Sequence, residues 1–435
     1  MLTLILGCTP EPACGDSLYC DVAAERRADV PPVLTVRWTS AEPTLGRVRF
    51  GASSDDLAFE TALEAEATTE HEHHLVGLPA NTEGFFQVVD DLGSSPVLSA
   101  TTGGLSPDLP DLTVTGSAGL GGFVVIALEG SLWGPVILDP QGNIVWWDEA
   151  TPDFAVTRAY LSKDRTAVLY NESNDRGDEY EEMAEGYVVR VPLDGSGAER
   201  LEFPYLSHDF VELPGGELVG IARYEEAVDG VTYLGDKLVE RALDGSFTDR
   251  WSAFDDYDPL TTGADDVRGT WTHANAVDYD EASDSLLVGL RNFASIVRVS
   301  RQTSEVTWSF GGLVGAVRPS ADEGGRDTYH QFVVDDNRVL AFDNGSEGRG
   351  YTRLVEYDLA GGAPEPTLSW EWTEDPATYV PVLGDVNVVG EGDVLASLSL
   401  EGQILRVDRE GEVVFGVASQ LGYGFGYAQV VDSLY

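Results

Sequence analysis

Basic residues are scarce in this chain of 435 residues. Lysine occurs only at Lys163 and Lys237, and lysine and arginine together number 26 against 75 acidic residues. The formal net charge is −49. Nucleic-acid binding needs a cluster of basic side chains facing the phosphates, and the sequence holds no such cluster. The composition therefore excludes nucleic acid as a partner and indicates an acidic surface suited to solubility in a salty setting.

Cysteine is equally scarce, and all three cysteines fall within the first twenty residues. The apolar run LTLILGC ends at Cys8 and resembles the end of a bacterial lipoprotein signal, although no basic residue precedes it. The alternative is a chance apolar N-terminus. We expect an exported protein, periplasmic or anchored at the outer membrane through a lipid on Cys8. In such an oxidising compartment Cys14 and Cys20 are expected to form a disulfide.

Long apolar runs are missing from the rest of the chain, so membrane contact is expected only through the lipid anchor. What the sequence does contain is glycine, 48 residues of it, within a composition that is 43% hydrophobic. This balance is typical of a globular, turn-rich β protein and not of a disordered one. We predict an all-β protein in which a small β-sandwich precedes a larger repeat domain.

The β-sandwich is predicted over residues 31–103. Short alternating segments such as VLTVRWTS and GRVRFGA predict its strands. The segment LVGLPANTEGFFQV resembles the turn between strands E and F of fibronectin type III-like domains, although the tyrosine of that corner is missing. Around this domain, we expect residues 1–8 to be a signal remnant, and 9–30 and 104–111 to be linkers, the first containing cysteine and the second rich in proline and glycine.

A cluster of histidines falls within the predicted sandwich, in the spacing HxHH: His71, His73 and His74. Two of them alternate onto one face of a strand, but no third metal ligand is evident. The pattern therefore favours a solvated strand edge over a metal site.

Residues 112–435 repeat a four-stranded unit, and successive units start about 50 to 60 residues apart, a spacing typical of propeller blades. Hairpins such as GPVILDPQGNIVWWD and GQILRVDREGEVVFG recur six times, and a second hairpin precedes each of the last five. Six units of four strands predict a six-bladed β-propeller. The last segment, YAQVVDSLY, reads as a strand without a partner, so we expect it to complete the first blade and close the ring.

The leading hairpins carry the chemistry. In five units the first strand begins with a charged or titratable residue: Arg158, His208, His273, His330 and Asp385. The first strand of a propeller blade is innermost, so these side chains should meet at one rim of the central channel. Asn275 lies two residues after His273 and shares its face of the strand. Antiparallel pairing brings the end of the same hairpin, at Arg291, to the same rim.

This constellation can be read in three ways. Polar residues of inner strands can simply satisfy backbone groups and channel water. Three histidines also suit zinc. A nearby arginine repels a cation, however, and favours an anion. We therefore predict an anion site without metal or cofactor, with Arg158 and Asp385 among its binding residues.

Three segments that contain these residues, HDFVELPGGELV, WTHANAVDYDEASDSLLVGLRNFASIVRVSRQTSEVTWSFGG and YHQFVVDDNRVLAFDNG, resemble the bacterial, nucleotide-independent arylsulfate sulfotransferase family. The similarity extends over residues 112–435. Members of that family are periplasmic six-bladed propellers. They transfer a sulfuryl group between phenols through a sulfated histidine and use no phosphosulfate nucleotide.

The resemblance implies roles for particular residues. His330 would be the nucleophile, and His208, His273, Asn275 and Arg291 would hold the sulfuryl oxygens. Where the family has Tyr-Arg near its C-terminus this chain has Tyr427-Ala428, so Tyr427 is expected to contribute to the cavity wall. Tyr329 stands where glutamine is common.

The substrates implied are an aryl sulfate and a phenol, both small molecules, and the sequence leaves the oligomeric state open. Two other functions stay open at this point. One is a non-catalytic envelope propeller that binds an anionic or aromatic ligand. The other is a metal-dependent hydrolase that uses the same histidines.

Overall fold

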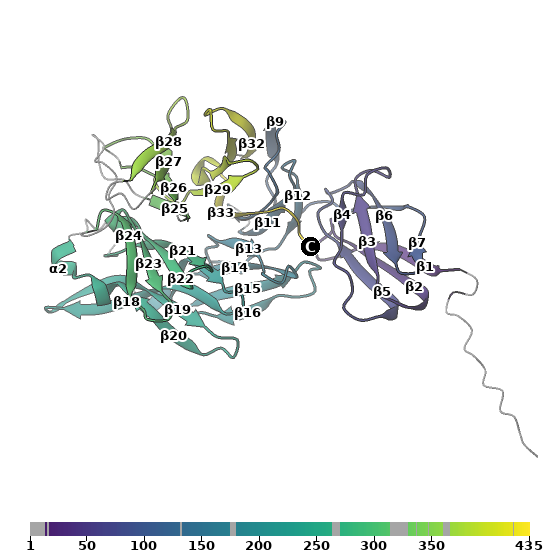
Figure 1. Cartoon of the computed structure of the whole chain (residues 1–435), viewed down its shortest axis with the longest axis horizontal. Helices are drawn as coiled ribbons and strands as arrows, with labels where there is room; N and C mark the ends of the chain where they lie inside the picture. Colours follow the sequence, from purple (N-terminus) through teal and green to yellow (C-terminus); the bar gives the residue numbers. More distant parts are fainter. Residues whose placement is uncertain are drawn as a thin grey trace, which may run out of the picture.

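The computed structural model describes residues 14, 17–130, 133–174, 180–262, 270–313, 329–335, 337–346, 348–359, 366–420 and 422–435. Cys8 and the predicted signal remnant lie outside these residues. Within them, no helix has the length and apolarity needed to cross a membrane. The chain forms a small β-sandwich beside a larger ring of sheets (Figure 1).

The sandwich consists of two sheets. One contains β1 (Tyr19–Arg26), β2 (Leu34–Thr44) and β5 (Thr68–Leu75), and the other contains β3 (Arg47–Gly51), β4 (Phe59–Glu60), β6 (Glu83–Asp90), β7 (Gly93–Ser94) and β8 (Leu98–Thr101). Alternate residues such as Val36, Trp38 and Phe86 are buried between the sheets, as the period of two in these segments predicts.

The N-terminal boundary of the sandwich differs from the prediction. Strand β1 pairs with β2 along most of its length, so residues 19–26 belong to the sandwich and not to a linker. A disulfide joins Cys20 of this strand to Cys14, which precedes the strand.

The histidines of the sandwich do not form a solvated edge. His71 is buried, stacks on Trp38 with ring centroids 4.4 Å apart, and places Nδ1 2.8 Å from Glu64. His73 also approaches Glu64, at 3.5 Å. The described residues contain no group of three side chains placed to hold a metal ion. Packing against Trp38 explains the burial that the pattern alone did not predict.

Residues 112–435 form the six-bladed β-propeller that the repeats predict (Figure 1). From the inside outward, its blades contain the following strands. Blade one has β33 (Gly424–Val431), β10 (Phe123–Glu129), β11 (Gly134–Leu138) and β12 (Ile144–Trp147). Blade two has β13 (Ala159–Leu161), β14 (Ala167–Ser173), β15 (Gly186–Pro192) and β16 (Glu199–Glu202). Blade three has β17 (Leu206–Glu212), β18 (Leu218–Val228), β19 (Val231–Arg241) and β20 (Phe247–Ser252). Blade four has β21 (Ala274–Asp280), β22 (Ser285–Leu290), β23 (Ser295–Ser300) and β24 (Val306–Gly311). Blade five has β25 (Tyr329–Val334), β26 (Arg338–Asp343), β27 (Arg353–Asp358) and β28 (Thr367–Trp372). Blade six has β29 (Asp385–Val389), β30 (Asp393–Ser397), β31 (Gln403–Val407), β32 (Val413–Ser419) and β9 (Leu112–Gly116).

Helices are short and lie between strands. They are α1 (Ala253–Asp256), α2 (Pro259–Thr262) and the 3-10 turns η1 (Tyr180–Ala184), η2 (Arg291–Phe293) and η4 (Ser399–Glu401).

Two strands close the ring. The C-terminal strand β33 pairs with β10 as the innermost strand of blade one, as predicted. Strand β9 pairs with β32 and adds a fifth, outer strand to blade six, which the sequence did not predict. Residues near both ends of the propeller sequence thus connect its first and last blades, and each inner strand that the structure describes has a partner strand in its own blade.

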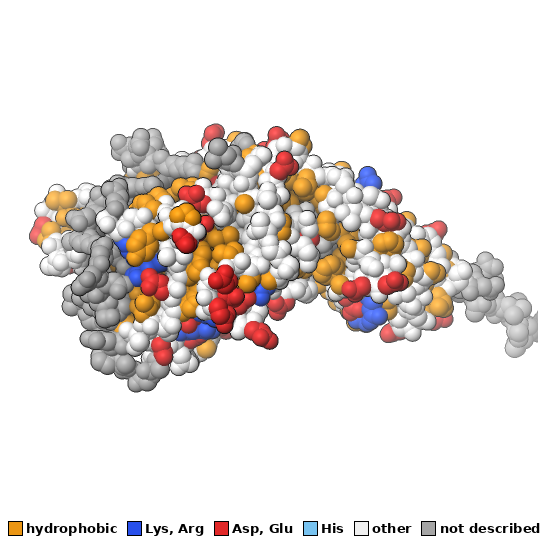
Figure 2. Space-filling model, turned by 90° about the horizontal axis from the view of Figure 1, so that it is seen from above, with side chains coloured by type: hydrophobic (Ala, Val, Ile, Leu, Met, Phe, Trp, Pro, Cys, Tyr) orange, Lys and Arg blue, Asp and Glu red, His pale blue; other side chains and the backbone are white. Residues whose placement is uncertain are grey.

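The sandwich rests against the propeller through apolar and polar contacts. Val30, Val33 and Val76 pack in one cluster with Phe123 of β10. The hydroxyl of Tyr435 accepts from the backbone N–H of Val76 at 2.6 Å. Acidic side chains far outnumber basic ones on the visible face of the molecule, in keeping with the net charge (Figure 2).

Candidate functional site

The three histidines of the propeller lie at the starts of the inner strands of blades three, four and five. The rings of His208 and His273 meet edge to face, with centroids 5.0 Å apart. Both residues adopt a left-handed backbone, with φ of 24° and 49°. The inner hairpin of each of these blades also has a break in register beside its histidine. Such bulges redirect side chains, which explains how successive strands aim imidazoles at one place.

The ring of His208 has a defined orientation. Its Nδ1 lies 2.7 Å from Ser207 Oγ and 3.4 Å from Arg223 Nη2. Because a guanidinium can only donate, Nδ1 accepts, and in the neutral ring the proton is on Nε2. Arg223 is held in turn by Asp236 at 2.7 Å, and Asp236 accepts the backbone N–H of Ala274 in the next blade.

His273 lies beside Arg291, the arginine that the sequence places at the same rim. The backbone N–H of Arg291 donates to the carbonyl of His273 at 3.1 Å, so the two ends of this hairpin meet as its antiparallel pairing predicts. Thr270 Oγ1 lies 3.0 Å from Nδ1 of His273. The guanidinium of Arg291 reaches the carbonyl of Pro381 at 3.5 Å.

Asn275 is fully buried, and among the described residues neither atom of its side-chain amide has a hydrogen-bond partner. A buried amide without a partner costs free energy, so its presence beside His273 points to a polar ligand that supplies the missing bonds.

His330 is the most enclosed of the three histidines. Its Nε2 accepts the backbone N–H of Leu383 at 3.0 Å, and its Nδ1 lies 3.0 Å from the hydroxyl of Tyr427. Burial lowers the pKa of His330 well below its usual value, and electrostatic interactions with His208, Arg291 and Arg158 lower it further. His330 is therefore neutral, and it lies within electrostatic reach of the other members of the cluster.

Arg158 and Asp385 make hydrogen bonds and an ion pair within the protein. Arg158 pairs with both carboxylate oxygens of Asp209, at 2.8 and 3.1 Å, and its guanidinium covers the ring of Tyr427 at 4.6 Å. The carboxylate of Asp385 accepts hydrogen bonds from the backbone N–H groups of Ala428 and Val386. Their hydrogen bonds thus connect inner strands of the ring, and the predicted contact of these two residues with the substrate stays a prediction.

Asp209 is the important residue that the sequence reasoning missed. It is fully buried, and besides Arg158 it accepts the backbone N–H of Val277 at 3.0 Å and the side-chain amide of Gln331 at 2.9 Å. It therefore ties together the inner strands of blades two, three, four and five. The available signal was its position: Asp209 directly follows His208, just as Gln331 directly follows His330.

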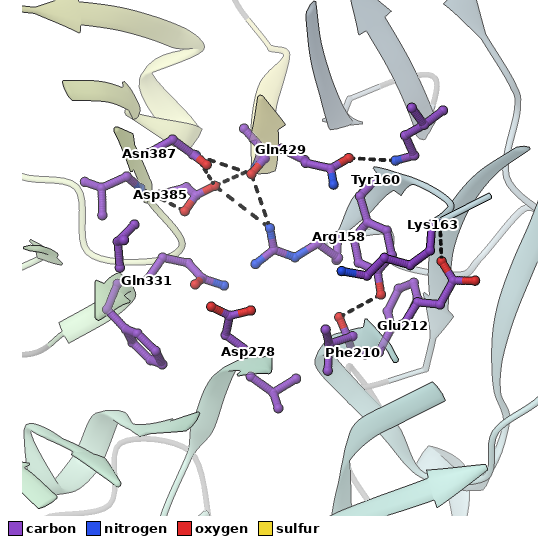
Figure 3. Close-up of a pocket in the computed structure, with 17 residues that line it drawn as sticks. Arg158, Tyr160, Lys163, Phe210, Glu212, Asp278, Gln331, Asp385, Asn387 and Gln429 are labelled. Atoms are coloured by element: carbon purple, nitrogen blue, oxygen red, sulfur yellow. Dashed lines mark hydrogen bonds and ion pairs between the residues drawn. The ribbon is translucent and has the colours of Figure 1, made fainter. Parts of the chain in front are cut away.

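A separate cavity of about 200 Å³ lies on the same axis (Figure 3). Polar residues from several blades line it, among them Arg158, Asp278, Gln331, Asp385 and Asn387. None of the three histidines does. Its lining residues Gln331, Phe210 and Val277 follow the histidines of their blades by one to four positions, so the cavity lies directly beyond the histidines along the inner strands. Burial raises the pKa of Asp385 to about 6 and also raises the pKa of Asp278.

The fold and the cluster define a six-bladed propeller whose inner strands bring three histidines, an arginine and an unpaired amide to one end of the axis. The family model for arylsulfotransferase (ASST) matches residues 127–414. The chain therefore belongs to the arylsulfotransferase family.

No curated protein matches the chain. Solved structures with some similarity include a protein of unknown function from Bacteroides caccae, with 10% identity, 71% of this chain and 98% of that chain covered, and a TM-score of 0.44. The β-propeller domain of Cps50 (Swd1) from Myceliophteria thermophila has 12% identity, 74% and 96% coverage, and a TM-score of 0.40. Virginiamycin B lyase from Staphylococcus aureus has 11% identity, 74% and 100% coverage, and a TM-score of 0.35. At such low values these structures carry no argument of their own.

Proposed function

We propose that the protein transfers a sulfuryl group from an aryl sulfate to a phenol through a sulfated His330. Membership of the arylsulfotransferase family supports aryl sulfuryl transfer in general. The observation that carries the finer proposal is His330 itself, a buried imidazole kept neutral by its surroundings. A neutral imidazole has the free electron pair that a nucleophile needs.

In the first step the electron pair on Nε2 of His330 attacks the sulfur of the donor. The N–S bond forms, the bond from sulfur to the aryl oxygen breaks, and its electron pair leaves with the phenolate. His208, whose Nε2 carries a proton in the neutral ring, donates a hydrogen bond from Nε2–H to the departing oxygen, and the released phenolate takes its proton from water. Arg291, Asn275 and His273 hold the three sulfuryl oxygens, over which the negative charge spreads in the transition state.

The second step runs the same chemistry in reverse. A phenol binds where the first product left and loses its proton to water, and the phenolate oxygen, held by the Nε2–H of His208, attacks sulfur while the N–S bond breaks. The electron pair of that bond returns to Nε2, and His330 is neutral again. In the structure Nε2 accepts a hydrogen bond from the N–H of Leu383. The hydrogen bond from this amide to Nε2 must therefore break before the attack, and the amide can then donate to a sulfuryl oxygen.

The test is turnover of a chromogenic aryl sulfate with and without added phenol, before and after chelation, with His330→Asn as the variant. We expect phenol-dependent release that survives chelation and is lost in His330→Asn. His74→Asn, in the sandwich, is the matched histidine control and should keep the activity. Mass spectrometry at neutral pH should find sulfate on His330 after treatment with donor alone.

Other outcomes would favour the competing functions. Release that a chelator abolishes would indicate a metal-dependent hydrolase. Absence of turnover with any donor would leave a ligand-binding propeller, and a His330→Asn variant with unchanged transfer would overturn the covalent mechanism.

The proposal includes export of the protein to an oxidising compartment. The Cys14–Cys20 disulfide supports it, because such bonds persist outside the cytosol. A lipid anchor on Cys8 is tested by metabolic labelling with a fatty acid, which Cys8→Ala should abolish. Labelling that persists in this variant would contradict the anchor.

A further inference from the structure

The hydrogen bonds of His330 determine which ring nitrogen carries its proton. A backbone N–H can only donate, so Nε2 of His330 must accept from Leu383. In a neutral imidazole the proton is then on Nδ1, from which it is donated to the hydroxyl of Tyr427 at 3.0 Å. The hydroxyl of Tyr427 donates its own hydrogen to the carbonyl of Asn275 at 2.9 Å. In this series of hydrogen bonds every donor has an acceptor, and each group donates to the next one, from Leu383 through His330 and Tyr427 to Asn275.

We propose that Tyr427 is a positioning residue that keeps the proton on Nδ1 of His330 and so reserves Nε2 for attack on sulfur. The predicted role for Tyr427 was a wall of the substrate cavity. Its contacts argue for a further one, because its hydroxyl is directed at His330 and Asn275 while Arg158 covers its ring. The side chain is fully buried among these groups.

Tyr427 cannot itself take the proton from His330. Burial raises the pKa of Tyr427 well above its usual value, and the nearby carboxylates of Asp209 and Asp385 raise it further. Arg158 opposes them, but burial is the largest influence. The hydroxyl thus stays protonated and serves as a fixed acceptor for Nδ1–H, with its own hydrogen committed to a carbonyl that is not basic.

This arrangement has a consequence for the covalent intermediate, which rests on the function proposed above. When Nε2 bonds to sulfur, the proton on Nδ1 has no base to go to, so the ring becomes an N-sulfoimidazolium cation. In the second step the phenolate oxygen bonds to sulfur, and the electron pair of the N–S bond leaves on a neutral imidazole. If Nδ1 lost its proton, the leaving group would instead be an imidazolide anion, which leaves far less readily. Tyr427 therefore keeps the intermediate reactive toward its acceptor.

The test is the tautomer of His330 in protein labelled with ¹⁵N-histidine, read from the ¹⁵N shifts of the two ring nitrogens. Signals that vanish in His330→Asn assign the ring. We expect a protonated Nδ1 and an unprotonated Nε2 in the wild-type protein. In Tyr427→Phe we expect the population with protonated Nε2 to rise. Wild-type spectra with the proton on Nε2 would overturn the proposal whether or not the protein is active. The tautomer measurement therefore tests the role of Tyr427 independently of the proposed function.

The matched control is Tyr160→Phe, which also removes a buried hydroxyl that donates to a backbone carbonyl, that of Phe210 in the next blade, at 3.2 Å. Both variants lose one such hydrogen bond, but Tyr160 does not contact a histidine. We expect Tyr427→Phe to slow the transfer of sulfate from charged enzyme to phenol by about 10- to 100-fold, the usual effect of losing a partner that orients a functional histidine. Tyr160→Phe should retain the wild-type rate and the wild-type spectrum. If the two variants have the same His330 tautomer and the same transfer rate, Tyr427 has only a structural role and the proposal is wrong.

Discussion

At the scale of single residues, the neutral state of His330 depends on its burial. Its lowered pKa means that the folded protein binds fewer protons than the unfolded chain once the pH falls below the ordinary histidine value of 6.5. The free energy of unfolding contributed by this residue is fully present above pH 6.5. It is lost progressively as the pH falls toward the lower pKa of the folded state.

This linkage gives a measurable prediction. Comparing wild type with His330→Asn by chemical denaturation between pH 7.5 and 5, we expect wild type to lose more stability on acidification. The difference should grow by at most about 1.4 kcal/mol per pH unit, the value for one proton. Parallel curves for the two proteins would mean that His330 titrates alike in the folded and unfolded states.

The sequence predicted part of the cluster because chemistry and register coincide there. His208, His273 and His330 begin equivalent hairpins, and the pairing of one hairpin placed Arg291. The contact of Leu383 with His330 could not be predicted in this way, because it is made by a backbone N–H and does not depend on the type of side chain. Its φ of 56°, unusual for leucine, appears only in the structure.

At the scale of secondary-structure elements, the inner strands are held together by buried charges as well as by packing. Asp209 contacts residues of three other blades, and its pair with Arg158 is almost fully enclosed. Removing one member of such a pair leaves an unpaired buried charge, which typically costs 3–5 kcal/mol.

We therefore expect Asp209→Asn to lower the free energy of unfolding by about 3–5 kcal/mol, and Arg158→Met in the same chain to restore much of the loss. Denaturant titration of the two single variants and the double variant measures this coupling. The control is Asp164→Asn, because its pair with Arg190 is largely exposed and should be worth about 1 kcal/mol or less. Additive effects of the Asp209 and Arg158 substitutions would show that the two side chains do not act as a pair.

Strands were predictable where one face is buried and not where both are exposed. The inner strands have strong apolar patterns, and the closing strand β33 was recognised because the repeat left it without a partner. Strand β9 is mostly exposed and β1 only partly buried, so neither has the alternation that identifies a strand. The positions of β1 and β9 are determined by the sheet edges with which they pair, that of β2 and that of β32.

At the scale of the whole molecule, the net charge of −49 opposes the approach of an anionic donor. Salt screens that repulsion over distances beyond about 10 Å at 0.1 M, whereas contacts with Arg291 inside the site are screened much less.

We expect kcat/KM for an aryl sulfate to rise as the ionic strength increases from about 0.01 to 0.3 M, because the Debye length shortens over that range. The corresponding constant for an uncharged phenol acceptor should stay nearly level, and it is the internal control. Steady-state kinetics at several salt concentrations measure both. A fall in kcat/KM for the donor would mean that the positive charges of the site dominate the approach.

The placement of Tyr427 on β33 has a consequence for how the protein matures. This tyrosine is reached only after all the other blades have been synthesised, and the strand that carries it is the one that joins the first blade to the sixth. A nascent or truncated chain without residues 424–435 would have all three histidines but not the hydroxyl that orients the last of them. In a refolding sample the full rate of transfer would then be reached only when this strand has docked, so the rate of turnover reports the completion of the ring.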